Sequence, residues 1–203
     1  MKKINALVVL SLAAASTFAA EAGKTYGVAV GAYYRISIPA AGEDAGSSWT
    51  GGAARLRYDW SDALAFTAAF TYDRHEFPEP PLEVVDPGVA VERQLLSFRG
   101  GIAFDMPLSV IYPYAGGGAA LARENTYFRS GRLEPKVLYH PGLYGEAGIN
   151  VPLVGPLAVD AGPELVLLFG KRVAAYDAAI NGYRYDDGAA LYFGLKAGVA
   201  IHF

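Results

Sequence analysis

The chain has 203 residues, of which 53% are hydrophobic and only 18% are charged, and its formal net charge is −3. This charge balance gives no sign of a basic nucleic-acid-binding surface, and no nucleic-acid partner is expected. The lack of cysteine excludes a disulfide framework, thiolate metal sites and a cysteine nucleophile. Typical soluble domains carry roughly 25% charged residues, yet no apolar run in the body of this chain reaches the ~18 residues of a membrane helix. Apolar residues at alternate positions, as in a membrane β-barrel, account for both properties.

The N-terminus has the pattern of an export signal. Lys2 and Lys3 precede an apolar stretch, and Ala20-Glu21-Ala22 fits a small-x-small cleavage site, with Thr17-Phe18-Ala19 as the alternative. We therefore predict a signal peptide over 1–22 and a single domain over 23–203. The alternative is an uncleaved membrane anchor, but the stretch is short and rich in Ala and Ser.

Eight segments of the remaining chain alternate apolar residues with small or polar ones, which is typical of strands with two different faces. The expected strands are 26–37, 51–60, 64–75, 92–105, 110–124, 138–151, 157–169 and 191–203. The fifth is irregular because prolines and glycines blur its alternation, and a β-bulge is one explanation. The last is the clearest: at about 13 residues it exceeds the 5–6 of a usual strand.

The connections between these segments are alternately long and short. The long ones are 39–49, 77–91, 125–137 and 171–188, and the short ones are 61–63, 106–109 and 152–156. Short turns at one rim and long loops at the other are typical of outer-membrane barrels, whereas Greek-key sandwiches do not alternate so regularly. The predicted fold is all-β: a closed antiparallel up-and-down transmembrane barrel of about eight strands, with both termini in the periplasm.

Two further motifs complete this picture: the segment Tyr112-Pro113-Tyr114-Ala115-Gly116-Gly117-Gly118 and the final Val199-Ala200-Ile201-His202-Phe203. With the signal peptide and the alternating loops, they make the chain resemble the small eight-stranded outer-membrane barrels of the OmpX, OmpA-barrel and opacity-type families, and more loosely OmpW. The resemblance implies a location in the outer membrane, among membrane lipid and lipopolysaccharide. It also implies that the barrel-assembly machinery reads Phe203, Ile201 and Val199 as an assembly signal. We expect a monomer.

Charged residues on the polar faces of the strands are expected to point into the barrel: Arg55, Arg57, Arg99, Glu146, Asp160, Glu164 and Lys196. Eight strands enclose an interior just wide enough for side chains, and buried charges need partners. Because both signs are present, we predict a structural network that fills the lumen; a narrow polar conduit is the alternative. Counting from the strand ends predicts one layer in which Arg55 and Arg99 approach Glu146, and a second layer with Glu164 and Lys196.

The sequence predicts no catalytic, cofactor-binding or metal site. A lipid A deacylase on this fold would need His, Ser and an acid together, but His75 precedes Glu76-Phe77 and His140 precedes Pro141-Gly142. A metal site between His75 and His140 is the alternative if their strands approach. We expect a protein that is not an enzyme and holds no cofactor.

The long connections contain residue types that are enriched in recognition patches: Tyr127, Phe128, Arg129, Arg132, Tyr176, Tyr183, Arg184 and Tyr185. Tyrosine is equally typical of strands that cross the headgroup region, so both interpretations remain open. The first functional hypothesis is a non-enzymatic barrel that binds an extracellular protein or surface ligand through these loops, in adhesion, surface protection or envelope integrity. The alternative is an OmpW-like channel or transporter for small or hydrophobic solutes.

Overall fold

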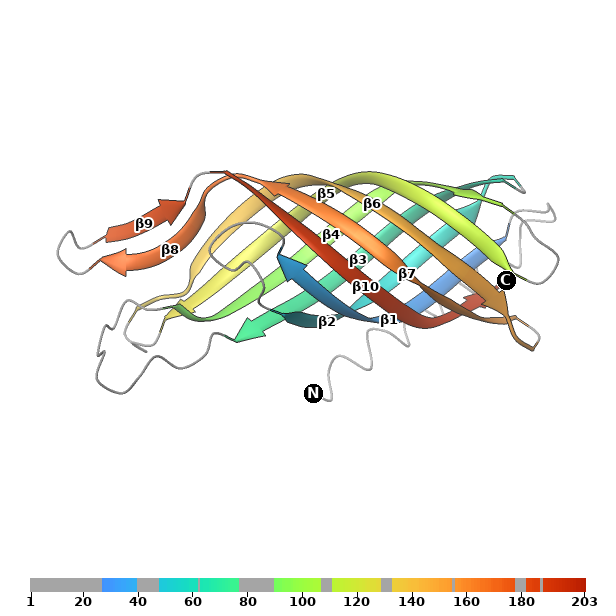
Figure 1. Ribbon diagram of the computed structural model, residues 1–203, viewed down its shortest axis with the longest axis horizontal. Coiled ribbons are helices and arrows are strands. Elements are labelled where there is room, and N and C mark those ends of the chain that lie inside the picture. Colours follow the sequence, from blue (N-terminus) through green and yellow to red (C-terminus); the bar gives the residue numbers. More distant parts are fainter. Residues whose placement is uncertain are drawn as a thin grey trace.

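Eight long antiparallel strands form a closed barrel in the computed structural model (Figure 1). The structure describes residues 27–39, 48–61, 63–76, 90–106, 111–128, 133–154, 156–177, 182–186 and 188–203. The predicted signal peptide lies outside these residues, as do Arg129 and Arg132. No helix among the described residues is both long and apolar enough to span a membrane.

The strands follow one another around the barrel in chain order. Their bounds are β1 (Val28–Pro39), β2 (Trp49–Asp59), β3 (Leu64–Glu76), β4 (Ala90–Asp105), β5 (Tyr112–Phe128), β6 (Lys136–Pro152), β7 (Leu157–Phe169) and β10 (Ala189–His202). Each pairs with its neighbour, and β1 closes the barrel against β10. The predicted up-and-down barrel of eight strands is confirmed, and β7 has its predicted bounds. The other strands differ by a few residues at their ends, as is usual for element boundaries.

A β-bulge within the fifth strand is not what the structure shows. The pairing of β5 with β4 is continuous from Tyr114 to Tyr127, and the one register shift lies between Ala90 and Glu92. The glycines serve close strand contact instead, because a Cβ at Gly118 would lie 2.1 Å from the carbonyl oxygen of Gly100.

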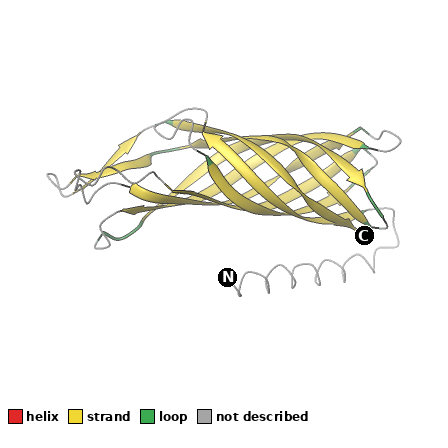
Figure 2. Cartoon of the chain, turned by 60° about the horizontal axis from the view of Figure 1, so that its bottom comes forward, coloured by secondary structure: helices red, strands yellow, loops and turns green. Residues whose placement is uncertain are grey.

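The predicted long loop at 171–188 is wrong in one respect, because much of it is a hairpin. Strands β8 (Arg172–Asp177) and β9 (Gly182–Asp186) form a separate two-stranded sheet. Gly170 and Gly188 flank the hairpin with φ angles of 121° and 149°, a region that favours glycine. The hairpin projects beyond the barrel at the end opposite the C-terminus (Figure 2).

The outside of the barrel is an apolar belt. On β3 the outward residues are Leu64, Phe66, Ala68, Phe70 and Tyr72, and the first charged one is Arg74. Large hydrophobic side chains are exposed on this surface, for example Phe98 at 58% and Leu195 at 56% exposure. A surface of this kind is far larger than the apolar patches of soluble monomers, so it is the surface that lipid covers. The predicted inward and outward faces are therefore confirmed.

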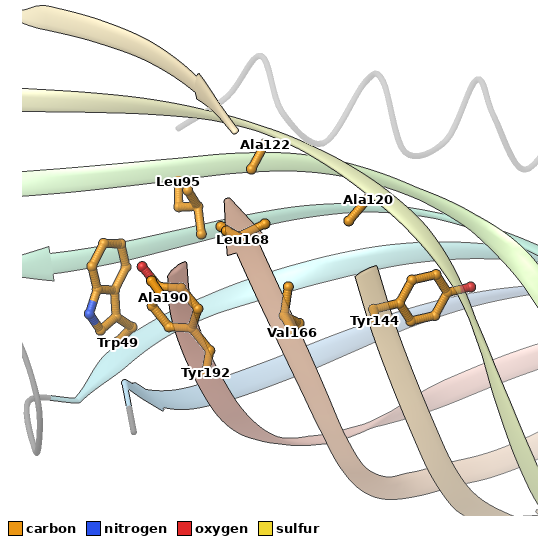
Figure 3. Close-up of a cluster of buried hydrophobic side chains, with 9 residues drawn as sticks. All are labelled: Trp49, Leu95, Ala120, Ala122, Tyr144, Val166, Leu168, Ala190 and Tyr192. Carbon is orange, nitrogen blue, oxygen red and sulfur yellow. The ribbon is translucent and has the colours of Figure 1, made fainter. Parts of the chain in front are cut away.

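The interior changes character along the barrel axis. Its middle holds charged side chains, whereas toward the hairpin it holds an apolar cluster that was not predicted from the sequence (Figure 3). The cluster comprises Trp49, Leu95, Ala120, Ala122, Tyr144, Val166, Leu168, Ala190 and Tyr192. Trp49 and Tyr192 meet edge to face, with ring centroids 5.7 Å apart. This cluster forms an apolar layer between the charged middle and the mouth.

Candidate functional site

The charged middle of the lumen contains one network around Glu146. Arg55 on β2 places Nη2 2.6 Å from Oε1 of Glu146 on β6. Lys196 on β10 donates to the other carboxylate oxygen, Oε2. Arg55 also lies with Nη1 3.3 Å from Oδ2 of Asp160 on β7. These contacts join β2 to β6, β7 and β10 across the interior of the barrel.

Two tyrosines complete the surroundings of Asp160. The Tyr114 hydroxyl donates to Oδ1 at 2.6 Å and the Tyr33 hydroxyl donates to Oδ2 at 3.1 Å. The same tyrosine rings make cation–π contacts. The guanidinium carbon of Arg55 lies 5.0 Å from the ring centroid of Tyr114, and Nζ of Lys196 lies 5.5 Å from that of Tyr33. Asp160 is therefore held by hydrogen bonds from groups that also pack against its cationic neighbours.

A second centre lies closer to the hairpin, around Glu164. Arg35 donates from Nε to Oε1 of Glu164 at 2.8 Å, and Arg99 donates from Nη1 to Oε2 at 2.9 Å. Arg35 also binds Asp73 on β3, with Nη1 2.5 Å from Oδ2. Glu164 is clamped between two guanidinium groups, an arrangement that suits the planar donor geometry of arginine.

The two centres are balanced in charge. They contain four cations (Arg35, Arg55, Arg99 and Lys196) and four carboxylates (Asp73, Glu146, Asp160 and Glu164). None has more than 6% of its side-chain area exposed. An unpaired charge at this depth would be costly, so a complete set of partners is what a closed lumen requires. We refer to these eight residues as the central network.

Six of the seven residues singled out in the sequence belong to the central network. Arg57 is the exception: its Nε lies 2.6 Å from Oδ1 of Asp59, and its Nη2 binds Asp105 nearer the C-terminal end of the barrel.

The predicted layers are only partly correct. Arg55 does meet Glu146, but Arg99 binds Glu164, and Lys196 binds Glu146 rather than Glu164. The reason is barrel shear, because neighbouring strands are staggered and equal counts from their ends do not give equal heights. Arg35 and Asp73 belong to the central network but were not among the residues predicted for it. The alternation that selected Arg55 was the signal that could have included them.

The mouth of the barrel holds a separate charged group. Glu124 on β5 is 1% exposed, and its Oε2 lies 2.7 Å from Nη2 of Arg172, the first residue of the hairpin. Arg93 approaches Oε1 of Glu124 at 3.8 Å and donates to the carbonyl oxygen of Val173 at 2.5 Å. His140 Nε2 is 3.6 Å from Oε2 of Glu124. The base of the hairpin is therefore seated inside the mouth.

Small cavities remain between these groups. One of about 20 Å³ is lined by central-network residues including Arg55, Arg99 and Lys196, and another of about 10 Å³ lies beside Asp73 and Trp49. A cavity of about 10–15 Å³ is enough to hold one water molecule. Each of these two cavities therefore has room for about one water. Oδ1 of Asp73 has no hydrogen-bond partner among the described residues, which makes the second cavity a suitable water site.

His75 and His140, the two histidines of the predicted metal-site alternative, have different surroundings. His75 stacks on Trp49, with centroids 5.5 Å apart, and its Nδ1 lies 2.9 Å from the carbonyl oxygen of Ser48. His140 belongs to the Glu124 group. Within the described residues, no three His, Asp or Glu side chains form a group that could hold a metal ion.

Comparison with known proteins identifies the fold. Neither a protein-family model nor a curated protein matches the sequence. Neisserial surface protein A is similar in structure, with a TM-score of 0.62 and 15% identity over 89% of this chain and 98% of that one. Ail, the attachment invasion locus protein of Yersinia pestis, solved with the heparin analogue sucrose octasulfate, gives 0.52 and 16% over 88% and 97%. The outer membrane protein OprG from Pseudomonas aeruginosa gives 0.54 and 13% over 88% and 95%.

The chain thus has the fold of small eight-stranded outer-membrane β-barrels, as the sequence resemblance implied. Because the sheet is closed, every barrel strand is hydrogen-bonded to a neighbour on both of its edges. The apolar belt on the outside matches the lipid-facing surface of this class. The chain therefore has the architecture of an outer-membrane barrel.

Proposed function

We propose that this protein is a closed, non-enzymatic barrel that presents the β8–β9 hairpin as a binding surface for an extracellular protein or another surface ligand. Adhesion is the role that such a surface supports best, with surface protection and envelope integrity as related roles. The observation that carries the proposal is the contrast between a filled lumen and a firmly seated projecting hairpin.

The filled lumen argues against solute transport. Passage would have to displace the ion pairs of the central network and then the apolar cluster above them. Breaking a buried ion pair costs about 3–5 kcal/mol, and the central network contains several that share partners.

The hairpin offers a rigid aromatic and basic surface. Tyr183 packs against Phe128 at the end of β5, with ring centroids 5.5 Å apart, and the Lys136 ammonium lies 5.0 Å from the Tyr183 ring. Arg184 and Tyr185 are exposed. Seating of the hairpin base lowers the entropy lost on binding, and Tyr and Arg are the side chains that most often anchor interfaces.

Two measurements test this function. In planar bilayers the purified barrel should show no discrete conductance steps; regular steps in the wild type would favour the channel alternative. Cells that display the barrel should adhere to surfaces coated with fibronectin, collagen or heparin more than cells without it. The variant Arg184→Ala/Tyr185→Ala should lose that adhesion, whereas Val154→Ala in a short turn at the opposite end should not.

Export and assembly belong to the same proposal. We infer that residues 1–22 are removed on export, that the barrel is monomeric, and that the assembly machinery recognises the end of β10. Val199 and Phe203 support the last point because their side chains are exposed on the lipid side, at 49% and 43%. Replacement of Phe203 by Ala should lower the amount of folded barrel in cells more than it lowers the stability of the purified protein.

A further inference from the structure

Two arginines point outward at the hairpin end of the barrel, and they differ in their partners. Arg74 on β3 is neutralised by the protein, with Nη2 2.7 Å from Oε1 of Glu76 and 2.8 Å from Oε2 of Glu92. Arg123 on β5 is exposed and has no ion-pair or hydrogen-bond partner among the described residues. A cation without a protein partner on a membrane-embedded exterior calls for an anion from outside the chain.

The strand register gives Arg123 a second polar neighbour. Tyr139 on β6 is its direct cross-strand partner, and Leu96 on β4 faces it from the other side. Side chains at such paired positions have Cβ atoms about 4.5–5.5 Å apart. Tyr139 is 65% exposed, and its hydroxyl also has no partner in the described part of the chain. A guanidinium and a phenol hydroxyl therefore stand side by side without a protein acceptor.

The position of Arg123 and Tyr139 along the barrel axis shows which part of the membrane surrounds them. Below Arg123, the outward residues of β5 are apolar or small: Pro113, Ala115, Gly117, Ala119 and Leu121. Arg123 lies ten residues from Pro113. At ~3.3 Å per residue and a strand tilt of ~40°, this separation is about 25 Å along the membrane normal, the height of the apolar band of such barrels. Arg123 thus lies where the apolar belt meets the headgroups.

We propose that Arg123 and Tyr139 form a binding site for the phosphate of a lipid headgroup in the outer leaflet. The planar guanidinium can hold two phosphate oxygens at once, and the tyrosine hydroxyl can donate to a third. The lower dielectric at the belt edge strengthens this attraction relative to water. Leu96 is directly opposite Arg123 on β4, and Leu121 lies two residues nearer the apolar belt on β5, so acyl chains of the same lipid would pack against them. That apolar contact favours a lipid over free phosphate.

The site is independent of the ligand of the hairpin and is tested separately. The full mature barrel is purified in a non-ionic detergent and titrated with lipid A carrying two phosphates, and bound lipid is counted by native mass spectrometry. Arg123→Gln should reduce the affinity about tenfold, as expected for loss of a hydrogen-bonded charge pair. Arg74→Gln, on the same exterior but paired internally, should change the affinity by less than about twofold. Because Arg123 has no described partner, the variant should fold, as heat-dependent gel mobility will verify.

Three further binding experiments test whether the ligand is the phosphate of a lipid. Tyr139→Phe should weaken binding by a factor of about three, through loss of one hydrogen bond. Enzymatically dephosphorylated lipid A should bind wild type and Arg123→Gln equally and weakly. Inorganic phosphate at millimolar concentration should not displace the lipid. Equal affinity of wild type for both lipids, equal effects of the Arg123 and Arg74 variants, or displacement by inorganic phosphate would each overturn the proposal.

Discussion

Arg172 and Glu124 join the projecting hairpin to the barrel wall: Nη2 of Arg172, at the start of β8, lies 2.7 Å from Oε2 of Glu124, which β5 points into the mouth. Glu124 is buried, and Val173, the next residue of the hairpin, is fully buried. The contact therefore forms away from water, where an ion pair is least screened. It makes the hairpin an extension of the barrel rather than a loose loop, a property that a binding surface needs.

Substitution of Glu124 should loosen the hairpin. Glu124→Gln leaves Arg172 and Arg93 without their carboxylate, and we expect the free energy of unfolding to fall by about 3–5 kcal/mol. A spin label at a Cys introduced in place of Arg184 should become more mobile, and the lack of native cysteine makes this labelling specific. Glu76→Gln, which touches only the exposed pair with Arg74, should cost less than about 1 kcal/mol. Identical spectra for Glu124→Gln and wild type would show that the hairpin is held by other contacts.

The pairing inside the central network predicts specific couplings. Double-mutant cycles should give coupling energies of about 0.5–3 kcal/mol for Arg55 with Glu146 and for Arg99 with Glu164. The cycle of Arg99 with Glu146 is the matched control and should give a much smaller value, because no ion pair or hydrogen bond joins these two side chains. Urea titrations of the barrel refolded into lipid vesicles would supply the free energies. A larger coupling for Arg99 with Glu146 than with Glu164 would mean that the network is paired by layers counted from the strand ends.

The sequence predicted which side chains point into the barrel, but it did not predict how far along the barrel axis each one lies. Strict alternation assigned Arg55 and Glu146 to the inward face, because a one-residue shift in register would reverse every side chain of a strand. It could not show that Arg99 meets Glu164, because that depends on the stagger between strands. The apolar cluster was missed for a related reason. Val166 and Leu168 share a strand face with charged Glu164, so their inward position was clear but their common height with Trp49 was not.

The lipid-facing belt predicts a strong dependence on depth. Leu165 is 49% exposed near the middle of β7, whereas Ala189 begins β10 at the hairpin end. Arg at position 165 should lower the free energy of unfolding by about 2–4 kcal/mol, and Arg at position 189 by about 0–1 kcal/mol. Val166→Arg should also be costly, because it buries a charge in the apolar cluster. Refolding titrations in lipid would rank the three, and equal costs at 165 and 189 would contradict the position of the belt.

The orientation of the barrel can be tested with single cysteines. Val154 precedes the start of β7 and the hairpin follows its other end, so the two lie at opposite ends of the barrel. Val154 is 82% exposed, and Arg184 in the hairpin is exposed as well. If long connections face the outside, a membrane-impermeant maleimide should label Arg184→Cys on intact cells but not Val154→Cys. Rupture of the outer membrane should make both react, which controls for reactivity. Neither position takes part in the central network or in the Glu124 group, so both variants should fold. Labelling of Val154→Cys alone on intact cells would mean that the barrel is inserted the other way, and the hairpin could then not serve as an extracellular binding surface.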